Sequence, residues 1–220
     1  VDCLYVSTAV EDHIPDVKAA ISKGIPIKKR SDLLAEIFHR YKNSIAVGGT
    51  SGKTTTTAMI GYILDKLGQL PCMINGGLLR NYENQPGIPN IIFNKGDICV
   101  IEADESDGSI EKYHPYIAVI NNISLDHKPI PELQKIFGDF AARSEYGAVV
   151  NADCEASKDI KHPHKKTVTF SLENPRADFT AYNIKAIPGG TAYSLDGRNF
   201  RLNLIGRFNV ANALAAIAAC

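Results

Sequence analysis

The chain has 220 residues, of which 45% are hydrophobic and 22% are charged, so it is long enough to bury the core of a globular protein. Its 24 basic and 24 acidic residues cancel, which argues against nucleic acid or an anionic membrane as a partner. No apolar run is long enough to predict a transmembrane helix, and residues 1–13 do not read as a signal peptide. The scattered cysteines include no CxxC pair and are expected to be reduced, buried thiols of a cytoplasmic protein.

Helices and strands are predicted to alternate through the first two thirds of the chain. Ser31 is a plausible N-cap for a helix that continues to about residue 42. On a later helix Met59, Ile63 and Leu67 form an apolar line, with Ile60 and Leu64 beside it. Strands are predicted at 3–7, 44–48, 98–103, 116–120 and 147–151, and helices at 15–22, 31–42, 53–67 and 130–143. This alternation predicts a mainly parallel sheet with helices on both faces.

The pattern changes after residue 166. Four short stretches there, at 166–171, 178–187, 191–196 and 199–203, have the composition of strands. The turn signals Pro-Gly-Gly at 188–190 and Asp-Gly at 196–197 predict hairpins between them. We therefore expect a small antiparallel subdomain beside the parallel sheet, followed by a final helix that begins near Asn209.

The segment GGTSGKTT at residues 48–55 has the setting of a phosphate-binding loop, because it lies between an apolar strand and an amphipathic helix. Glycines let backbone N–H groups turn toward phosphate oxygens, and the start of the helix adds a partial positive charge. Lys53 is expected to reach the β and γ phosphates, and the Thr54 hydroxyl to ligate Mg²⁺. Val47 replaces the first glycine of the usual motif, and a chance match in a glycine-rich turn is the alternative. As a loop lysine, Lys53 is expected to be exposed and to contribute little to packing.

Four carboxylates, those of Glu102, Asp104, Glu105 and Asp107, follow the strand predicted at 98–103. Ligands of a parallel sheet bind outside the carboxyl ends of its strands. Clustered carboxylates repel one another unless a cation shares the site, and Mg²⁺ with oxygen ligands fits. A solvated acidic loop is the alternative, since such clusters are common on protein surfaces.

Several motifs in one order resemble the Mur ligase family. They are GTSGKTT at 49–55, NGGL at 75–78, EADESD at 102–107, Asn122-Ile123 with Asp126-His127, and Asn209 with Asn212 before an alanine-rich stretch. The resemblance covers most of the chain and is stronger than the phosphate loop alone. It implies an α/β fold of the phosphate-loop type, with a mainly parallel sheet, flanking helices and a small antiparallel subdomain. It also implies an ATP-dependent carboxylate–amine ligase that uses ATP and Mg²⁺.

The resemblance also implies roles for individual residues. Lys53, Glu105 and His127 are expected to be catalytic, with Thr54, Glu105 and His127 as metal ligands and with Glu102 and Asp104 as neighbours of the metal. ATP is expected to contact Gly49, Thr50, Ser51, Gly52, Lys53, Thr54 and Thr55, and the substrate to contact Asn75, Gly76, Gly77 and Asn122. Lys128 departs from the family, which often has a small residue there; it is expected to pair with a phosphate or a carboxylate, or to face solvent.

The segment GRFNVAN at 206–212 resembles the part of the family that contacts adenine, with Phe208 in place of a histidine. Stacking on a purine survives that change, whereas a hydrogen bond from the ring does not. Phe208, Asn209 and Asn212 are therefore expected to bind the nucleotide. The alternative is an ordinary helix start, with asparagine as a cap and Phe208 in the core.

The resemblance divides the chain at residue 42. Residues 1–42 are similar to the end of the family's UDP-substrate-binding domain, although His13-Ile14-Pro15 replaces Asn-Pro-Glu, and residues 43–220 are similar to its central ATP-binding domain. Both ends of the chain fall inside predicted elements, so we expect a piece of a longer protein that lacks the C-terminal domain.

The implied function is the joining of L-alanine to UDP-N-acetylmuramate through an acyl phosphate, in the synthesis of the peptidoglycan precursor. One alternative is a Mur ligase that recycles a tripeptide. Another is an ATP-binding module without ligase activity, or a phosphate-loop kinase. Asn94-Lys95-Gly96-Asp97 has the letters of a GTPase base-reading motif, and we expect a chance match because it precedes the acidic strand in a turn. The oligomeric state is left open.

Overall fold

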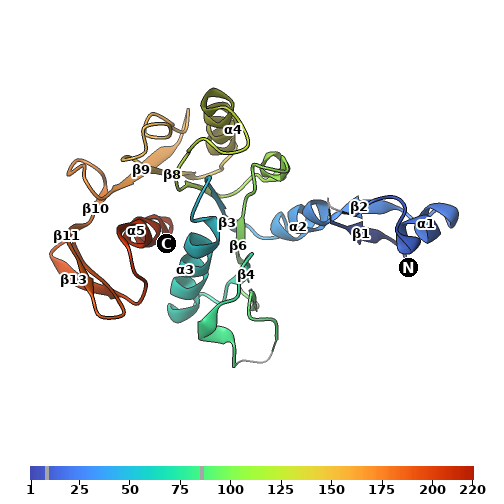
Figure 1. Cartoon of the computed structure of the whole chain (residues 1–220), viewed down its shortest axis with the longest axis horizontal. Helices are drawn as coiled ribbons and strands as arrows, with labels where there is room; N and C mark the ends of the chain where they lie inside the picture. Colours follow the sequence, from blue (N-terminus) through green and yellow to red (C-terminus); the bar gives the residue numbers. More distant parts are fainter. Residues whose placement is uncertain (8–9, 85–86) are drawn as a thin grey trace.

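The computed structural model describes residues 1–7, 10–84 and 87–220 (Figure 1). Thr8 and Ala9, in the segment likened to the family's first domain, lie outside the described residues. In Figure 1, the first 38 residues form an arm that extends away from a larger body. The whole is α/β, as predicted, with most of its strands in one sheet.

The arm contains two short parallel strands and two helices, namely β1 (Leu4–Val6), α1 (Pro15–Ser22), β2 (Ile27–Lys29) and α2 (Arg30–Phe38). Helix α2 joins the arm to the body, where its buried Phe38 packs edge-on against Tyr113 at a centroid distance of 5.7 Å. The prediction that Ser31 caps this helix is wrong. The Asp32 carboxylate accepts the Lys29 N–H at 2.8 Å, so the helix begins one residue earlier, and it ends at Phe38 rather than near 42.

Eight strands form the main sheet, in the order β10-β9-β8-β7-β3-β6-β4-β5. They are β3 (Asn43–Gly48), β4 (Cys72–Ile74), β5 (Ile91–Phe93), β6 (Ile98–Glu102), β7 (Ile117–Ile120), β8 (Gly147–Asn151), β9 (Lys166–Ser171) and β10 (Phe179–Thr180). Only β5 runs antiparallel to its neighbour. The expectation that residues from 166 onward are antiparallel is wrong for β9 and β10, because β9 pairs in parallel along the whole of β8 and extends the main sheet.

Helices cover both faces of this sheet (Figure 1). The helices α3 (Lys53–Lys66) and α5 (Arg207–Ala219) pack on one face, and α2 and α4 (Ile130–Ala142) pack on the other. Of the apolar residues predicted to share one side of α3, Ile60 and Leu64 are buried, and Met59 and Ile63 are partly buried against the core. Residues Thr56, Ile60 and Leu64 point inward, because Gly61 lets the helix approach Met73, while Leu67 is 63% exposed.

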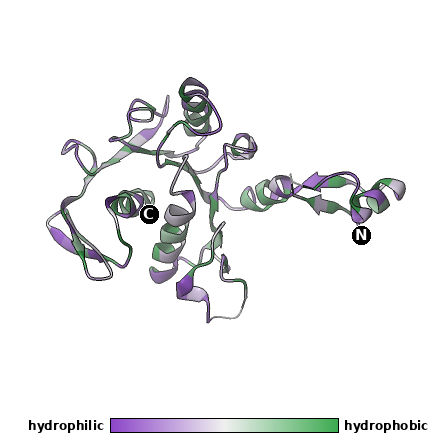
Figure 2. Cartoon of the chain, in the orientation of Figure 1, coloured by the Kyte–Doolittle hydropathy of each residue, from purple (hydrophilic) through white to green (hydrophobic). Residues whose placement is uncertain are grey.

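The small antiparallel sheet consists of β11 (Tyr182–Ile187), β12 (Gly190–Leu195) and β13 (Arg198–Leu202), with the two predicted hairpin turns between them. It packs on the side of α5 that faces away from the main sheet, through Tyr193 and Leu195. Helix α5 therefore lies between two sheets, which explains why it is apolar on all sides. Figure 2 shows hydrophobic residues along the central strands and hydrophilic residues on the strands of the arm and of the small sheet.

Candidate functional site

The phosphate loop lies between β3 and α3, in the strand–turn–helix setting predicted from its sequence. Gly49 and Gly52 have φ angles of 138° and 82°, which other residues rarely adopt. A Cβ atom on Gly52 would lie 2.4 Å from Asn121 Nδ2 and 2.5 Å from Asn212 Oδ1. Both the backbone angle and the lack of space therefore require glycine at position 52.

The segment after β7 holds the phosphate loop in place. The Asn122 carbonyl accepts the Thr50 N–H at 3.0 Å, and the Asn122 side chain exchanges two hydrogen bonds with the Ser51 backbone, at 3.0 and 2.8 Å. The Thr50 hydroxyl accepts the Ser124 N–H at 3.0 Å. The Asn122 amide, expected from the sequence to face the substrate, thus binds the loop backbone in this structure.

Lys53 is more enclosed than a loop lysine is expected to be. Its Nζ donates to the Gly49 carbonyl at 2.8 Å and lies 3.0 Å from Glu105 Oε2. The side chains of Lys53 and Glu105 are only 16% and 5% exposed. The prediction that Lys53 contributes little to packing is therefore wrong, since its removal would leave a buried carboxylate without its partner.

Glu102 links the phosphate loop to a second turn. Its carboxylate accepts the Thr54 hydroxyl at 3.0 Å and, through its other oxygen, the Gly76 N–H. Gly77 lies so near that a Cβ atom on it would be 2.9 Å from the Thr54 methyl group. The turn at residues 75–77, expected to face the substrate, therefore lies directly beside the start of α3, and the carboxylate at Thr54 is that of Glu102 rather than Glu105.

The other two acidic residues organise the loop that follows β6. Burial works against ionisation of Asp104, yet hydrogen bonds from the Ser106 N–H and hydroxyl, together with the charges of Lys53 and Arg30, hold the pKa of its carboxyl below the ordinary 3.8. Asp107 accepts the Ser109 N–H at 2.8 Å. The four carboxylates thus have different partners, and two of them shape the loop.

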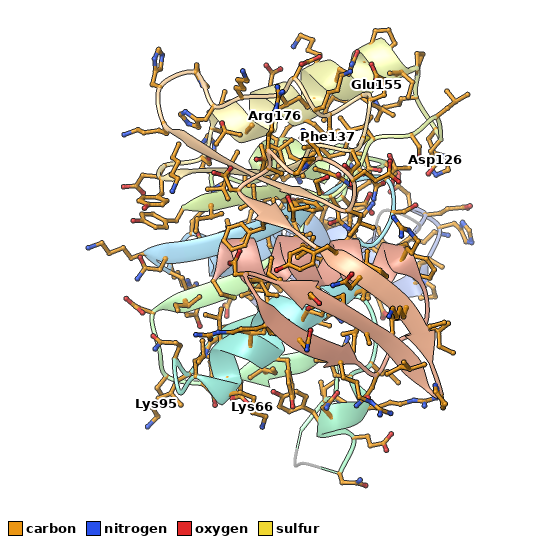
Figure 3. The ribbon with its side chains drawn as sticks, turned by 90° about the vertical axis from the view of Figure 1, so that its left-hand side faces the viewer. Lys66, Lys95, Asp126, Phe137, Glu155 and Arg176 are labelled. Carbon is orange, nitrogen blue, oxygen red and sulfur yellow. The ribbon has the colours of Figure 1, made fainter. Side chains whose placement is uncertain are left out.

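His127 and Asp126 lie on the exposed part of the segment between β7 and α4. Their side chains are 70% and 45% exposed, with His127 Nε2 3.5 Å from Asp126 Oδ1. Figure 3 shows Asp126 on the opposite side of the molecule from Lys66 and Lys95, so it marks the side where the parallel strands end. Lys128 forms an ion pair with Glu132 one helical turn further on, so of the three alternatives for this residue the structure shows pairing with a carboxylate.

A hollow of about 240 Å³ lies between the phosphate loop and the start of α5. Phe208 is 68% exposed at its edge, whereas Asn209 and Asn212 are 8% and 6% exposed. The alternative that places Phe208 in the core is therefore wrong. The hollow is lined by Ser51, Gly52, Asn121, Asn122, Asn151, Phe208, Ala211 and Asn212.

Comparison with known proteins decides the family. The sequence profile described as "Mur ligase middle domain" matches residues 47–220. The chain belongs to the Mur ligase family.

Two curated Mur ligases, each named UDP-N-acetylmuramate–L-alanine ligase, are 39% identical to this chain. The one from Thermosynechococcus vestitus aligns with 96% of this chain and 45% of its own length, and the one from Persephonella marina with 98% and 47%. The chain thus spans about half the length of the curated relatives it matches.

Two solved Mur ligase structures share the fold over nearly the whole chain. The UDP-N-acetylmuramate-alanine ligase of Thermotoga maritima superposes with a TM-score of 0.84 at 27% identity, covering 99% of this chain and 50% of that one. The UDP-N-acetylmuramate:L-alanyl-gamma-D-glutamyl-meso-diaminopimelate ligase of Neisseria meningitides gives 0.82 at 26% identity, covering 100% and 73%. These likenesses confirm the predicted fold class.

The structure brings together most of the residues for which Mur ligase membership suggests roles. The phosphate loop, Glu102, Glu105 and the turn at 75–77 meet at one edge of the sheet. His127 is near in sequence to residues that touch the loop, but its side chain is 70% exposed and its ring nitrogen lies 3.5 Å from Asp126 Oδ1. Within residues 1–7, 10–84 and 87–220, no group of three or more His, Cys, Asp or Glu side chains is disposed to hold a metal ion. The site residues therefore remain a proposal.

The GTPase-like letters at residues 94–97 lie away from this edge. Asp97 accepts a hydrogen bond from Asn43, the first residue of β3, and Asn94 donates to Asp65 near the end of α3. Figure 3 shows Lys95 on the side opposite Asp126. The structure thus places these four residues at the amino ends of the strands, where they cannot contact a base bound at the phosphate loop. No helix in the described part of the chain is long and apolar enough to cross a membrane.

Proposed function

We propose that this chain is the nucleotide-binding part of an ATP-dependent ligase that joins L-alanine to UDP-N-acetylmuramate in peptidoglycan precursor synthesis. One observation carries the proposal: Glu102 bridges Thr54 of the phosphate loop and Gly76 of the neighbouring turn, so phosphates and a second substrate can meet there. The names of the relatives at 39% identity support L-alanine as the amine. The proposed localisation is the cytoplasm, where ATP is available.

The residues present fit ATP at the phosphate loop. There is no room for a Cβ atom at position 52, and Gly52 has none. The N-terminus of α3 faces the loop, and Lys53 supplies a cation. Phe208 offers an exposed ring at the edge of the neighbouring hollow, on which a base can stack. We propose that Gly49, Thr50, Ser51, Gly52, Lys53, Thr54, Thr55, Phe208, Asn209 and Asn212 bind the nucleotide.

Thr54 and Glu102 are the oxygen ligands that Mg²⁺ would find beside the phosphates, with Glu105 and His127 as further candidates. When bound, the ion would neutralise charge on the transferring phosphoryl group. Lys53 would turn from Glu105 toward the phosphates, and the turn at Asn75, Gly76 and Gly77 would position the carboxylate. Asn122 would contribute by holding the loop.

In the proposed reaction the γ-phosphoryl group moves from ATP to a carboxylate oxygen of the muramate, which gives an acyl phosphate and ADP. The amine then attacks the acyl carbon, forms the amide and expels phosphate. Positioning and charge neutralisation suffice for such a transfer, so the site requires no protein nucleophile. Residues 1–42 would belong to a UDP-substrate-binding domain and residues 43–220 to the central domain.

The full-length protein, supplied with ATP, Mg²⁺, UDP-N-acetylmuramate and L-alanine, is expected to release ADP and form the amide, as followed by mass spectrometry. A parallel reaction with the tripeptide L-alanyl-γ-D-glutamyl-meso-diaminopimelate tests the recycling alternative, because the Neisseria meningitides enzyme named for that tripeptide shares the fold. If only the reaction with the tripeptide forms an amide, the tripeptide replaces L-alanine as the proposed amine. Failure to form an amide with either amine would overturn both.

A further inference from the structure

Three asparagine side chains form a hydrogen-bonded chain between the phosphate loop and the start of α5. Asn121 Nδ2 donates to the Ser51 carbonyl at 3.2 Å and to Asn212 Oδ1 at 2.7 Å. Asn212 Nδ2 donates to Asn209 Oδ1 at 3.2 Å, and Asn209 Nδ2 donates to the Ile205 carbonyl at 2.9 Å. From Asn121 onward every amide donates in the same direction, so the three dipoles reinforce one another.

All three side chains are buried, between 2% and 8% exposed, so they are largely shielded from solvent. Asn121 is anchored at its backbone as well, because its N–H donates to the Gly48 carbonyl and its carbonyl accepts from Asn151 Nδ2. Its Oδ1 has no hydrogen-bond partner among the residues that the structure describes, an arrangement that is costly for a buried acceptor. Asn121 is therefore held in place by its own backbone, and its side chain binds both the phosphate loop and α5.

The three hydrogen-bonded asparagines join the two ends of the proposed nucleotide site. One end is Ser51 in the phosphate loop, and the other is the turn at residues 205–206, which precedes Phe208. Asn121 and Asn212 are 91 residues apart in the sequence, and Gly52 fits between them without a Cβ atom. A shift of α5 on binding a base would therefore be transmitted to the loop through two side-chain bonds.

We propose that Asn121 is a positioning residue which, through Asn212, couples occupancy of the base end to the geometry of the phosphate loop. The inference rests on the proposed function, since it requires that a nucleotide binds here. It predicts that Asn212, although it lies at the base end, affects the binding of a ligand that has no base.

The test measures dissociation constants for ATP and for inorganic triphosphate, each with Mg²⁺, in the full-length protein and its variants. Asn212→Ala is expected to weaken triphosphate binding about fivefold, the size of one net amide hydrogen bond. The matched control is Phe208→Ala, which removes an exposed ring outside the amide chain and is expected to weaken ATP but leave triphosphate unchanged. If Asn212→Ala also leaves triphosphate binding unchanged, the coupling is refuted.

A double-mutant cycle provides a second readout. Asn121→Ala and Asn212→Ala are each expected to weaken triphosphate binding about fivefold, and the double variant to weaken it by about the same factor because the coupling passes through the bond between them. A double variant that binds about 25-fold more weakly, which is the product of the two single effects, would show that the two residues act independently and would overturn the proposal. Should either alanine variant fail to fold by circular dichroism, serine at the same position leaves a smaller polar group and serves in its place. Wild-type protein that binds neither ligand would instead refute the proposed function, and the coupling with it.

Discussion

Two halves of the proposed site differ in how completely the protein orders them. Around the phosphate loop, Lys53, Thr54 and Glu102 each have a partner within 3.0 Å. On the segment after β7, His127 and Asp126 are largely exposed, and the backbone is tied to the loop only as far as Ser124. The fold therefore orders the first half through these contacts, whereas it leaves the side chains of the second half largely exposed. This difference predicts unequal responses to mutation.

The largest effect is expected for Lys53→Ala. Loss of the ammonium group should lower ATP turnover of the full-length protein by about 100- to 1,000-fold, because the phosphates lose a positioned cation. Glu105 remains buried without a partner, so stability should fall by up to about 3–5 kcal/mol in denaturant unfolding. Lys66→Ala, at the other end of the same helix and exposed, is the control and should change neither. A Lys53→Ala protein with wild-type turnover would remove the phosphate-loop assignment.

The second effect separates the two carboxylates. Glu102→Gln should raise the Mg²⁺ concentration needed for half-maximal activity by about tenfold, because Glu102 holds the Thr54 hydroxyl and lies where the ion would bind. Glu105→Gln keeps the shape of the partner of Lys53 and should change this concentration less. Magnesium titrations of ATP turnover measure both. The reverse order would make Glu105 the metal ligand, as its sequence motif suggests.

A smaller effect on stability is expected in the exposed half. His127→Ala should lower activity while leaving the Tm within about 1 °C of wild type, since the side chain is 70% exposed. His164→Ala, another exposed histidine, should change neither quantity. A clear fall in Tm for His127→Ala would show that this segment is already ordered, and the contrast between the two halves would disappear.

The smallest effect concerns pH. The pKa of Asp104 is depressed in the folded protein, so its ionised form stabilises the fold above the ordinary value of 3.8, and this contribution is lost as pH falls below it. Asp104→Asn should therefore lower the Tm at pH 6, with a difference from wild type that shrinks between pH 5 and pH 3. A constant difference across that range would mean that hydrogen bonding to Ser106, not the charge, orders the loop.

Local sequence patterns predicted much of this fold. The strand–glycine turn–helix pattern at residues 44–67 was enough to place the phosphate loop, because its signals are local. The strands β2, β4 and β5 were missed, because such short stretches carry no period and their pairing depends on neighbours distant in sequence. The equally short β1 was predicted only because it lies within the apolar run at residues 3–7. The parallel pairing of β9 was missed for the same reason: strand composition does not specify the partner.

The site shows the same limit. The motifs predicted Lys53, Thr54 and the acidic residues as parts of the site. They did not predict which carboxylate contacts which partner, because that depends on how β6 lies against β3. Asn121 was missed as well. It precedes Asn122 in the motif, yet its contact with Asn212 spans 91 residues and leaves no local signal.

The position of α5 between two sheets has a consequence for the order of folding. Helix α3, at residues 53–66, packs on β3, β4 and β6, whereas β7, β8 and β9 are covered on the same face by α5, at residues 207–219. That part of the face therefore stays uncovered during synthesis until α5 has left the ribosome. Contacts between segments so distant form slowly, because a long loop must close first. We expect nascent chains that stop before Arg207 to expose this apolar face and to depend on chaperones, whereas those that extend beyond Ala219 can complete both layers at once.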